Sequence, residues 1–200
     1  MAGGAPTEWI AGCVRAHADL LADLEGLTDA QARGPCALPD WTVGHLLTHI
    51  ARNADSVVRR LEGSARGEVL DQYEGGFEGR RADIETGAHR PAAELVADVR
   101  TTAAAAERAM AALPDVAWDA RSRTVRGTEE DARAVVFSRW REVAVHHGDL
   151  GSGRERVQLP RALVEAWLPA ELAVLATRTD PGQLLSWVIG RGPAPALAPW

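Results

Sequence analysis

The sequence predicts a mainly α protein, a four-helix bundle with a long crossover connection and a short C-terminal helical or α/β appendage. Apolar residues recur every three or four positions in four long segments, which is the spacing of one face of a helix. A long connection rich in glycine and charge separates the second segment from the third, as in bundles with a crossover. We expect the bundle over 1–153 and a shortened segment packed on it over 154–200, since the latter is too short to fold alone.

The first predicted helix begins at Thr7, which is a plausible N-cap, and ends near Leu27. The second opens at Thr42 and is expected to stop at Gly63, because glycine is common just after a helix. Residues 64–90 are predicted to be the long connection, with a single helical turn.

Pro91 suits the first turn of a third helix, which should end before Pro114. An irregular or weakly extended segment follows. The fourth helix is expected to open at Thr128, where acidic residues favour the positive end of the helix dipole, and to end near Gly148. After it the sequence predicts one more helix, a short helix and an irregular tail.

Composition argues against several classes of protein. The net charge is −6 without a basic cluster, so the chain lacks the electrostatic footprint of a nucleic-acid-binding protein. No apolar run approaches the roughly 20 residues that span a membrane, and no secretory signal is visible. With two cysteines and no disulfide framework, a cytoplasmic protein is expected, as a monomer or weak homodimer that contacts neither membrane nor nucleic acid.

Two helical segments carry histidine and carboxylate at a spacing that suits a metal site. Glu142 and His146 are four residues apart, so their side chains share one face of a helix, and Asp149 extends that stripe. His45 and His49 repeat the spacing on the second helix. Bundle interiors bind metals through such residues on facing helices. The same spacings also fit solvated surface pairs, and from spacing alone both interpretations stay open.

The segments "LPDWTVGHLLTHIARNAD" and "RWREVAVHHGDLG" resemble the two signature segments of the mycothiol-dependent maleylpyruvate isomerase family, which lies in the DinB-like superfamily of metal-binding four-helix bundles. The segment "RRADIETGAHRPAAELVADV" and the ending, with "LLSWVIGRG" and "LAPW", resemble that family too. The resemblance implies three metal ligands: His49, Glu142 and His146. It leaves His45 and His147 as packing residues, or as partners that orient a ligand.

The resemblance implies a divalent metal, with zinc the first choice, and mycothiol as a thiol cosubstrate. A thiol bound to the metal becomes a thiolate, which can add reversibly to an activated alkene. This chemistry describes a cis–trans isomerase of the maleylpyruvate isomerase type with a small electrophilic substrate. Alternatives are a mycothiol S-transferase acting on an electrophilic metabolite, a non-catalytic metal-binding DinB-like protein, and a helical module without metal.

A dicarboxylate substrate requires cationic partners. Arg191 resembles the family's C-terminal arginine that reaches the active site, and it is the expected catalytic residue for binding substrate carboxylate. Arg52 and Arg139 are weaker options, for which surface ion pairs are favoured. Asn53 is a further candidate for lining the site, as is Asp149.

Two features depart from the family's pattern. Its C-terminal part is a small α/β domain, whereas the region after Ala162 is shortened here. A related thiol-dependent reaction therefore competes with maleylpyruvate isomerisation. Cys36 stands where serine is more usual, and we expect it to be a cysteine without catalytic function rather than a reactive thiol.

Overall fold

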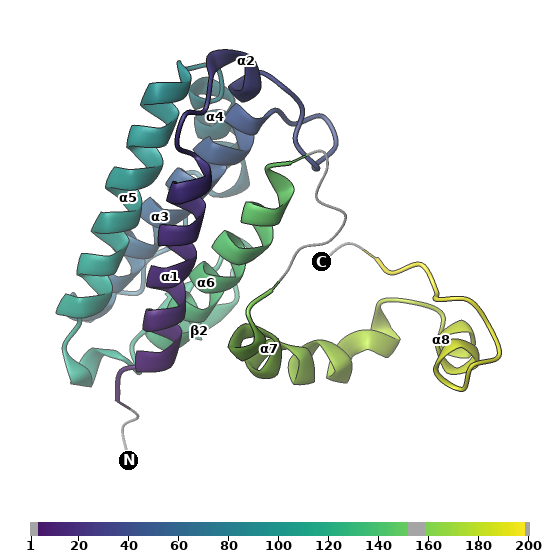
Figure 1. Cartoon of the computed structure of the whole chain (residues 1–200). Helices are drawn as coiled ribbons and strands as arrows, with labels where there is room; N and C mark the ends of the chain where they lie inside the picture. The colour runs from purple at the N-terminus through teal and green to yellow at the C-terminus, as the bar shows by residue number, and fades with distance from the viewer. Residues whose placement is uncertain (1–3, 152–158, 199–200) are drawn as a thin grey trace. The chain divides into compact units, whose positions relative to one another are not determined.

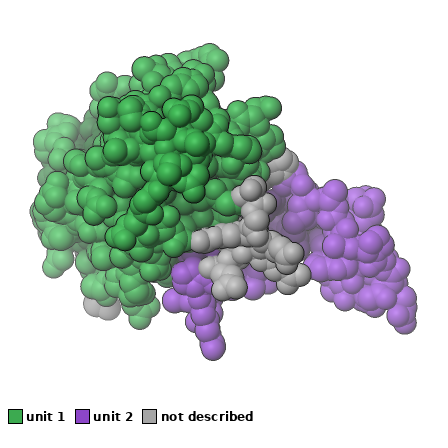
Figure 2. Space-filling view, turned by 45° about the horizontal axis from the view of Figure 1, so that its top comes forward, with its two compact units in different colours: residues 1–158 green, residues 159–200 purple. Residues whose placement is uncertain are grey.

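The computed structural model describes residues 4–151 and 159–198. The chain divides into two compact units, residues 1–158 and residues 159–200, which Figure 2 distinguishes by colour. The predicted boundary after residue 153 lies outside the described residues.

Four long helices build the first unit: α1 (Thr7–Asp23), α3 (Val43–Arg66), α5 (Ala92–Ala112) and α6 (Ala132–Asp149). Helix α3 packs against α5 and α6, and α1 packs against the same two helices, so the four enclose one core (Figure 1). This confirms the predicted mainly α bundle. Its core is formed by side chains that are almost fully buried, among them Leu20, Leu46, Leu47, Ile50, Leu95, Val99, Val135 and Val143.

Helix α3 begins where the sequence predicted but ends later. The Thr42 side chain accepts a hydrogen bond from the His45 backbone N–H, and the His45 ring accepts one from the Thr42 backbone N–H, which completes a capping box. The predicted stop at Gly63 is wrong. The helix continues to Arg66 and ends at Gly67, whose φ of 73° lies in the left-handed region that glycine adopts without strain.

The long connection contains more helix than predicted. Helix α4 (Gly76–Gly87) has 12 residues, where a single turn was expected, and the short α2 (Asp29–Ala32) was not predicted. The sequence of α4 has no apolar stripe, because only one of its side chains, Ile84, is fully buried and the others need not be apolar.

The approach to α6 also differs from the prediction. After a 3-10 turn, η1 (Asp115–Ala117), strand β1 (Arg121–Arg123) pairs antiparallel with β2 (Glu129–Asp131). The acidic run is therefore a strand rather than a first helical turn. Asp131 caps α6 by accepting a hydrogen bond from the Ala134 backbone N–H.

The described part of the second unit is helical. It contains α7 (Arg161–Val174), η2 (Leu175–Thr177) and α8 (Pro181–Val188). Of the two predicted forms of the appendage, these residues adopt the helical one. Among the described residues, no helix has the length and apolar character needed to cross a membrane.

Candidate metal centre

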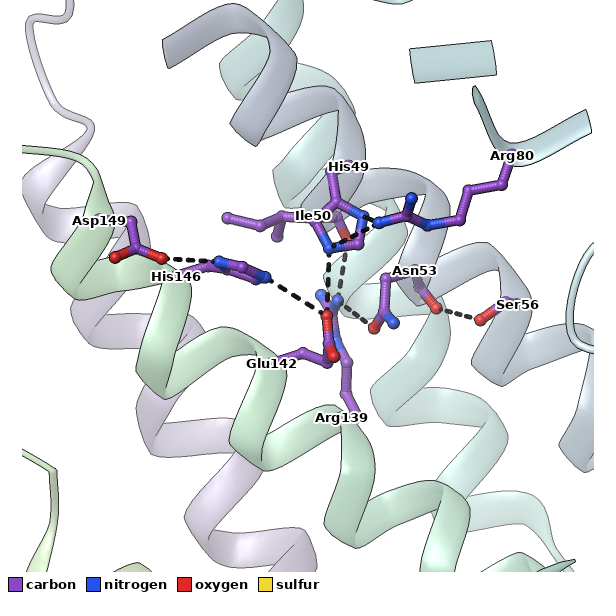
Figure 3. Close-up of polar contacts among 9 residues, drawn as sticks. All are labelled: His49, Ile50, Asn53, Ser56, Arg80, Arg139, Glu142, His146 and Asp149. Carbon is purple, nitrogen blue, oxygen red and sulfur yellow. Dashed lines mark hydrogen bonds and ion pairs between the residues drawn. The ribbon is translucent and has the colours of Figure 1, made fainter. Parts of the chain in front are cut away.

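Helices α3 and α6 bring His49, Glu142 and His146 together inside the bundle (Figure 3). The His49 Nε2 atom lies 3.1 Å from Glu142 Oε2, and His146 Nε2 lies 3.6 Å from the same oxygen. One ligand atom from each residue fits within 4.8 Å of the others. The three residues that the resemblance singled out therefore converge on one point, although their segments are far apart in the sequence.

Burial and hydrogen bonding set the charges of these side chains. Burial lowers the pKa of His49 to about 4, against the opposing effect of Glu142, so this imidazole is neutral at pH 7. Burial acts to raise the pKa of Glu142, but hydrogen bonds with His146 and His49 hold that pKa well below its usual range. An ionised carboxylate beside a neutral imidazole is the state that metal ligation requires.

Asp149 orients the third side chain. Its carboxylate accepts a hydrogen bond of 2.9 Å from His146 Nδ1, which leaves His146 Nε2 facing Glu142. Burial acts to lower the pKa of His146, yet hydrogen bonds with Asp149 and Glu142 raise it to about 9. Without an ion this ring is therefore protonated at pH 7, and a cation that binds here would displace its Nε2 proton. A carboxylate behind a histidine is the usual arrangement for fixing the tautomer of a metal-ligating imidazole.

Arg80, on α4, is a member of the site that the sequence analysis missed. Its Nη2 atom lies 3.1 Å from His49 Nδ1 and 3.5 Å from His49 Nε2, and Figure 3 shows it reaching the ring from the side opposite His146. A guanidinium only donates, so the ring nitrogen accepts. The charged segment "GFEGRRADIETG" gave no signal that one arginine would point inward, because α4 itself was not predicted.

Asn53 and Arg139 form a buried hydrogen bond next to the three candidate ligands (Figure 3). Arg139 is almost fully buried and donates to the Ile50 carbonyl at 2.8 Å, to Asn53 Oδ1 at 2.9 Å and to His17 Nε2 at 3.1 Å. The favoured surface ion pair for Arg139 is therefore wrong. These bonds tie α6 to α3 and α1, which fixes the separation of the helices that hold the three candidate ligands.

The other candidates lie apart from this cluster. The His45 Nε2 atom faces Glu85, at 3.4 Å. Arg52 forms ion pairs with Asp98 and Asp55, and the His147 ring forms one with Asp23. The role of Arg52 in binding substrate stays a prediction. Arg191 is an exposed residue of the second unit, and its role stays a prediction.

Neither cysteine is poised as a nucleophile. Burial raises the pKa of Cys13 to about 12 and also raises that of Cys36. Both thiols are free and protonated at neutral pH, as expected of structural cysteines.

Fold and site together define a DinB-like helical bundle with a candidate metal centre between two of its helices. Residues 13–151 match the family described as the mycothiol maleylpyruvate isomerase N-terminal domain. The chain belongs to this family, which confirms the resemblance noted in its sequence.

Two solved structures show the same fold. One is the crystal structure of the mycothiol-dependent maleylpyruvate isomerase, 23% identical with a TM-score of 0.74. The other is a histidine-to-alanine mutant of a mycothiol-dependent maleylpyruvate isomerase, 22% identical with a TM-score of 0.74. Each comparison covers 80% of this chain and 66% of the solved chain, so the present chain spans about two thirds of their length. A comparison with curated proteins finds no match.

Proposed function

We propose that this protein is a zinc- and mycothiol-dependent cis–trans isomerase of a small, maleylpyruvate-like unsaturated acid. The observation that carries the proposal is the convergence of His49, Glu142 and His146 within 4.8 Å of one another. Family membership and the fold of the solved isomerase agree with it.

The donor set fits zinc. Two imidazoles and one carboxylate are the ligands of many catalytic zinc sites, and three protein ligands leave a coordination position for a further donor. A divalent cation held there would lower the pKa of a coordinated thiol and so supply a thiolate at neutral pH. That thiol has to come from a cosubstrate, because both cysteines of this chain are held in the protonated form.

The isomerisation balances without any oxidant or reductant. A C–S bond forms at one alkene carbon while the π pair moves onto the conjugated carbonyl oxygen, which leaves a C–C single bond free to rotate. Return of that pair expels the thiolate and restores the double bond in the trans form. The protein has to bind the substrate carboxylates and stabilise the transient negative charge on oxygen.

Arg80 is suited to that task. If the lone pair of His49 Nε2 binds a cation, the ring proton resides on Nδ1, and Arg80 can no longer donate there. The guanidinium, 3.1 Å from this nitrogen, is then available to a carboxylate or an enolate oxygen. We expect Arg191 to provide the second carboxylate contact, as the family resemblance suggests.

The test uses untagged protein loaded with zinc and supplied with mycothiol and maleylpyruvate. Wild type should form fumarylpyruvate without consuming the thiol. Glu142→Gln should lower zinc affinity by more than about 100-fold and abolish turnover, because loss of even an indirect partner of a metal ligand costs about 10- to 100-fold. His147→Gln, on the same helix but paired with Asp23, is the matched control and should keep both.

A sulfur-containing product would instead assign the protein as an S-transferase. Zinc binding without reaction of the thiol would indicate a metal-binding protein that does not catalyse this chemistry. Either result would refute the isomerase proposal.

A further inference from the structure

A second cluster of two histidines and a glutamate lies where the start of α3 meets the end of α4. The His45 Nε2 atom is 3.4 Å from Glu85 Oε2, and His89 Nε2 is 3.8 Å from the other oxygen, Glu85 Oε1. The two imidazole rings lie edge to face with centroids 5.5 Å apart. One ligand atom from each residue again fits within 4.8 Å of the others. This cluster shares no residue with the first.

His45 is held in place by the cap of its own helix. It is buried, its ring stacks on Trp41, and its Nδ1 atom lies 2.7 Å from Thr42 Oγ1. In the capping box Nδ1 accepts from the Thr42 backbone N–H, so without an ion the ring proton is on Nε2, beside Glu85. An ion bound at Nε2 would displace that proton to Nδ1, which could then donate to the Thr42 hydroxyl oxygen. A fixed partner on one ring nitrogen is what orients a metal-ligating histidine.

The backbone brings the two helix ends unusually close. Gly44 lies directly against the Ala88 carbonyl, where a side-chain Cβ would have no room. The residues that follow each of these two positions, His45 and His89, are thereby placed side by side. Because Glu85 is four residues before His89, its carboxylate reaches both rings.

We propose that His45, Glu85 and His89 form a second binding site for a divalent transition ion of the zinc type, separate from the candidate catalytic centre. Ligand atoms around tetrahedral zinc, with bonds of about 2.0–2.1 Å, lie about 3.3–3.5 Å apart. The His45–Glu85 separation of 3.4 Å already meets that value. Only small rotations of Glu85 and His89, both about 70% exposed, are needed to complete the set.

Charge and ligand type favour such an ion over the alternatives. Among the described residues, the ion pairs of Glu85 are with His45 and His89 alone, so no arginine neutralises the carboxylate at contact distance. Imidazole nitrogen suits zinc, copper and nickel, whereas magnesium and calcium prefer oxygen. Since two ligands are exposed, solvent completes the coordination, and the site binds more weakly than the buried one.

The consequence for the fold is a clamp between α3 and α4. Ile84 is the one fully buried side chain of α4, so apolar packing alone holds this helix weakly. An ion at its C-terminal end would fasten it to α3. The same helix carries Arg80, which contacts His49 at 3.1 Å. The second site would thus keep Arg80 in position.

The test is zinc stoichiometry, which needs no catalytic assay. Untagged protein is stripped with a chelator and titrated with Zn²⁺ by calorimetry, and bound zinc is counted by elemental analysis after gel filtration. Wild type should bind two equivalents, and Glu85→Gln, His89→Gln and Glu142→Gln one each. The double variant Glu85→Gln/Glu142→Gln should bind none. Glu78→Gln, an exposed carboxylate of α4 outside the cluster, is the control and should bind two.

Thermal unfolding adds a readout of the clamp. In the Glu142→Gln background, Zn²⁺ should still raise the Tm, and the added Glu85→Gln change should remove that rise. Both Glu85 and His89 are largely exposed, so the variants fold.

The outcomes separate this proposal from the proposed function. If the wild type binds one equivalent of zinc, and Glu85→Gln loses it while Glu142→Gln keeps it, the second site is supported and zinc binding at the first site is refuted. The second site would be overturned if the wild type bound one equivalent that only Glu142→Gln lost. It would also be overturned if Glu85→Gln and His89→Gln both still bound two equivalents.

Discussion

At the scale of single residues, the buried pair of His17 and Arg139 shows how one hydrogen bond fixes a charge state. Arg139 Nε donates to His17 Nε2 at 3.1 Å, and His17 Nδ1 donates to Glu107 at 2.8 Å. Protonation of Nε2 would place a hydrogen where the arginine N–H already points. Burial, with the Arg139 charge as a second cause, lowers the pKa of His17 to about 3.

This pair predicts a pH dependence of stability. The unfolded chain takes up a proton on His17 near pH 6.5, whereas the folded chain does so near pH 3. Between these values the unfolded state binds more protons, so the free energy of unfolding should fall as pH falls, by up to about 1.4 kcal/mol per pH unit. Urea unfolding of wild type and His17→Gln at several pH values measures the difference. The wild-type slope should be steeper below pH 6.5.

Above pH 7 the two proteins serve as each other's control, because His17 is then neutral in both states and the curves should run parallel. Equal slopes below pH 6.5 would contradict the assignment of a buried neutral histidine.

The sequence predicted the residues of the candidate metal centre only in part. The spacing of four between Glu142 and His146 places both on one face of a helix in any sequence, so local geometry predicts their adjacency. That His49 meets them depends on how α3 packs against α6, for which the family resemblance rather than spacing gave the prediction. The inward turn of Arg80 and the burial of Arg139 depend on tertiary contacts, and no local pattern encodes them.

At the scale of elements, the helices with a long apolar face were predicted and those without one were not. Helix α3 shows regular burial along its length, and the sequence located its start at Thr42. Helix α4 buries one side chain fully and contains several glycines, which lower helix propensity. Because α4 is helical through its packing against α3, local apolar periodicity did not predict it. The acidic residues at 129–131 predicted a first helical turn, but they pair with β1 as a strand, and Asp131 alone caps α6.

The contact between these two helices yields a prediction for stability. Gly44→Ala would push a methyl group into the Ala88 carbonyl, and neither backbone can yield without moving α4. We expect a loss of about 1–3 kcal/mol in the free energy of unfolding, typical of overpacking. Chemical denaturation measures it.

Glu62→Ala, on an exposed position of α3, is the comparison variant and should change stability by less than about 0.5 kcal/mol. If Gly44→Ala were as stable as Glu62→Ala, the close approach of α3 and α4 would be disproved.

At the scale of the whole molecule, the candidate ligands all belong to the first unit, whereas Arg191 belongs to the second. Metal binding should therefore be a property of the bundle, and recognition of substrate carboxylate a property of the complete chain. This division also separates what the sequence predicts by its own pattern from what it does not. The bundle follows from helical periodicity, whereas the role proposed for Arg191 comes from the family resemblance alone, because no local pattern predicts it.

The division is tested by Arg191→Gln in the full chain. We expect zinc stoichiometry to be unchanged, while kcat/KM for a dicarboxylate substrate falls by about 10- to 100-fold, since a hydrogen bond to a charged group contributes about 1.5–3 kcal/mol. Arg161→Gln is the matched control, since this arginine of the same unit is exposed and pairs with Glu165 at its surface. A reduced zinc content in Arg191→Gln would show that the second unit supports the metal centre itself. If the variant instead kept the wild-type kcat/KM, Arg191 would be excluded from the substrate site. Arg80 would then be the candidate cation of the described bundle.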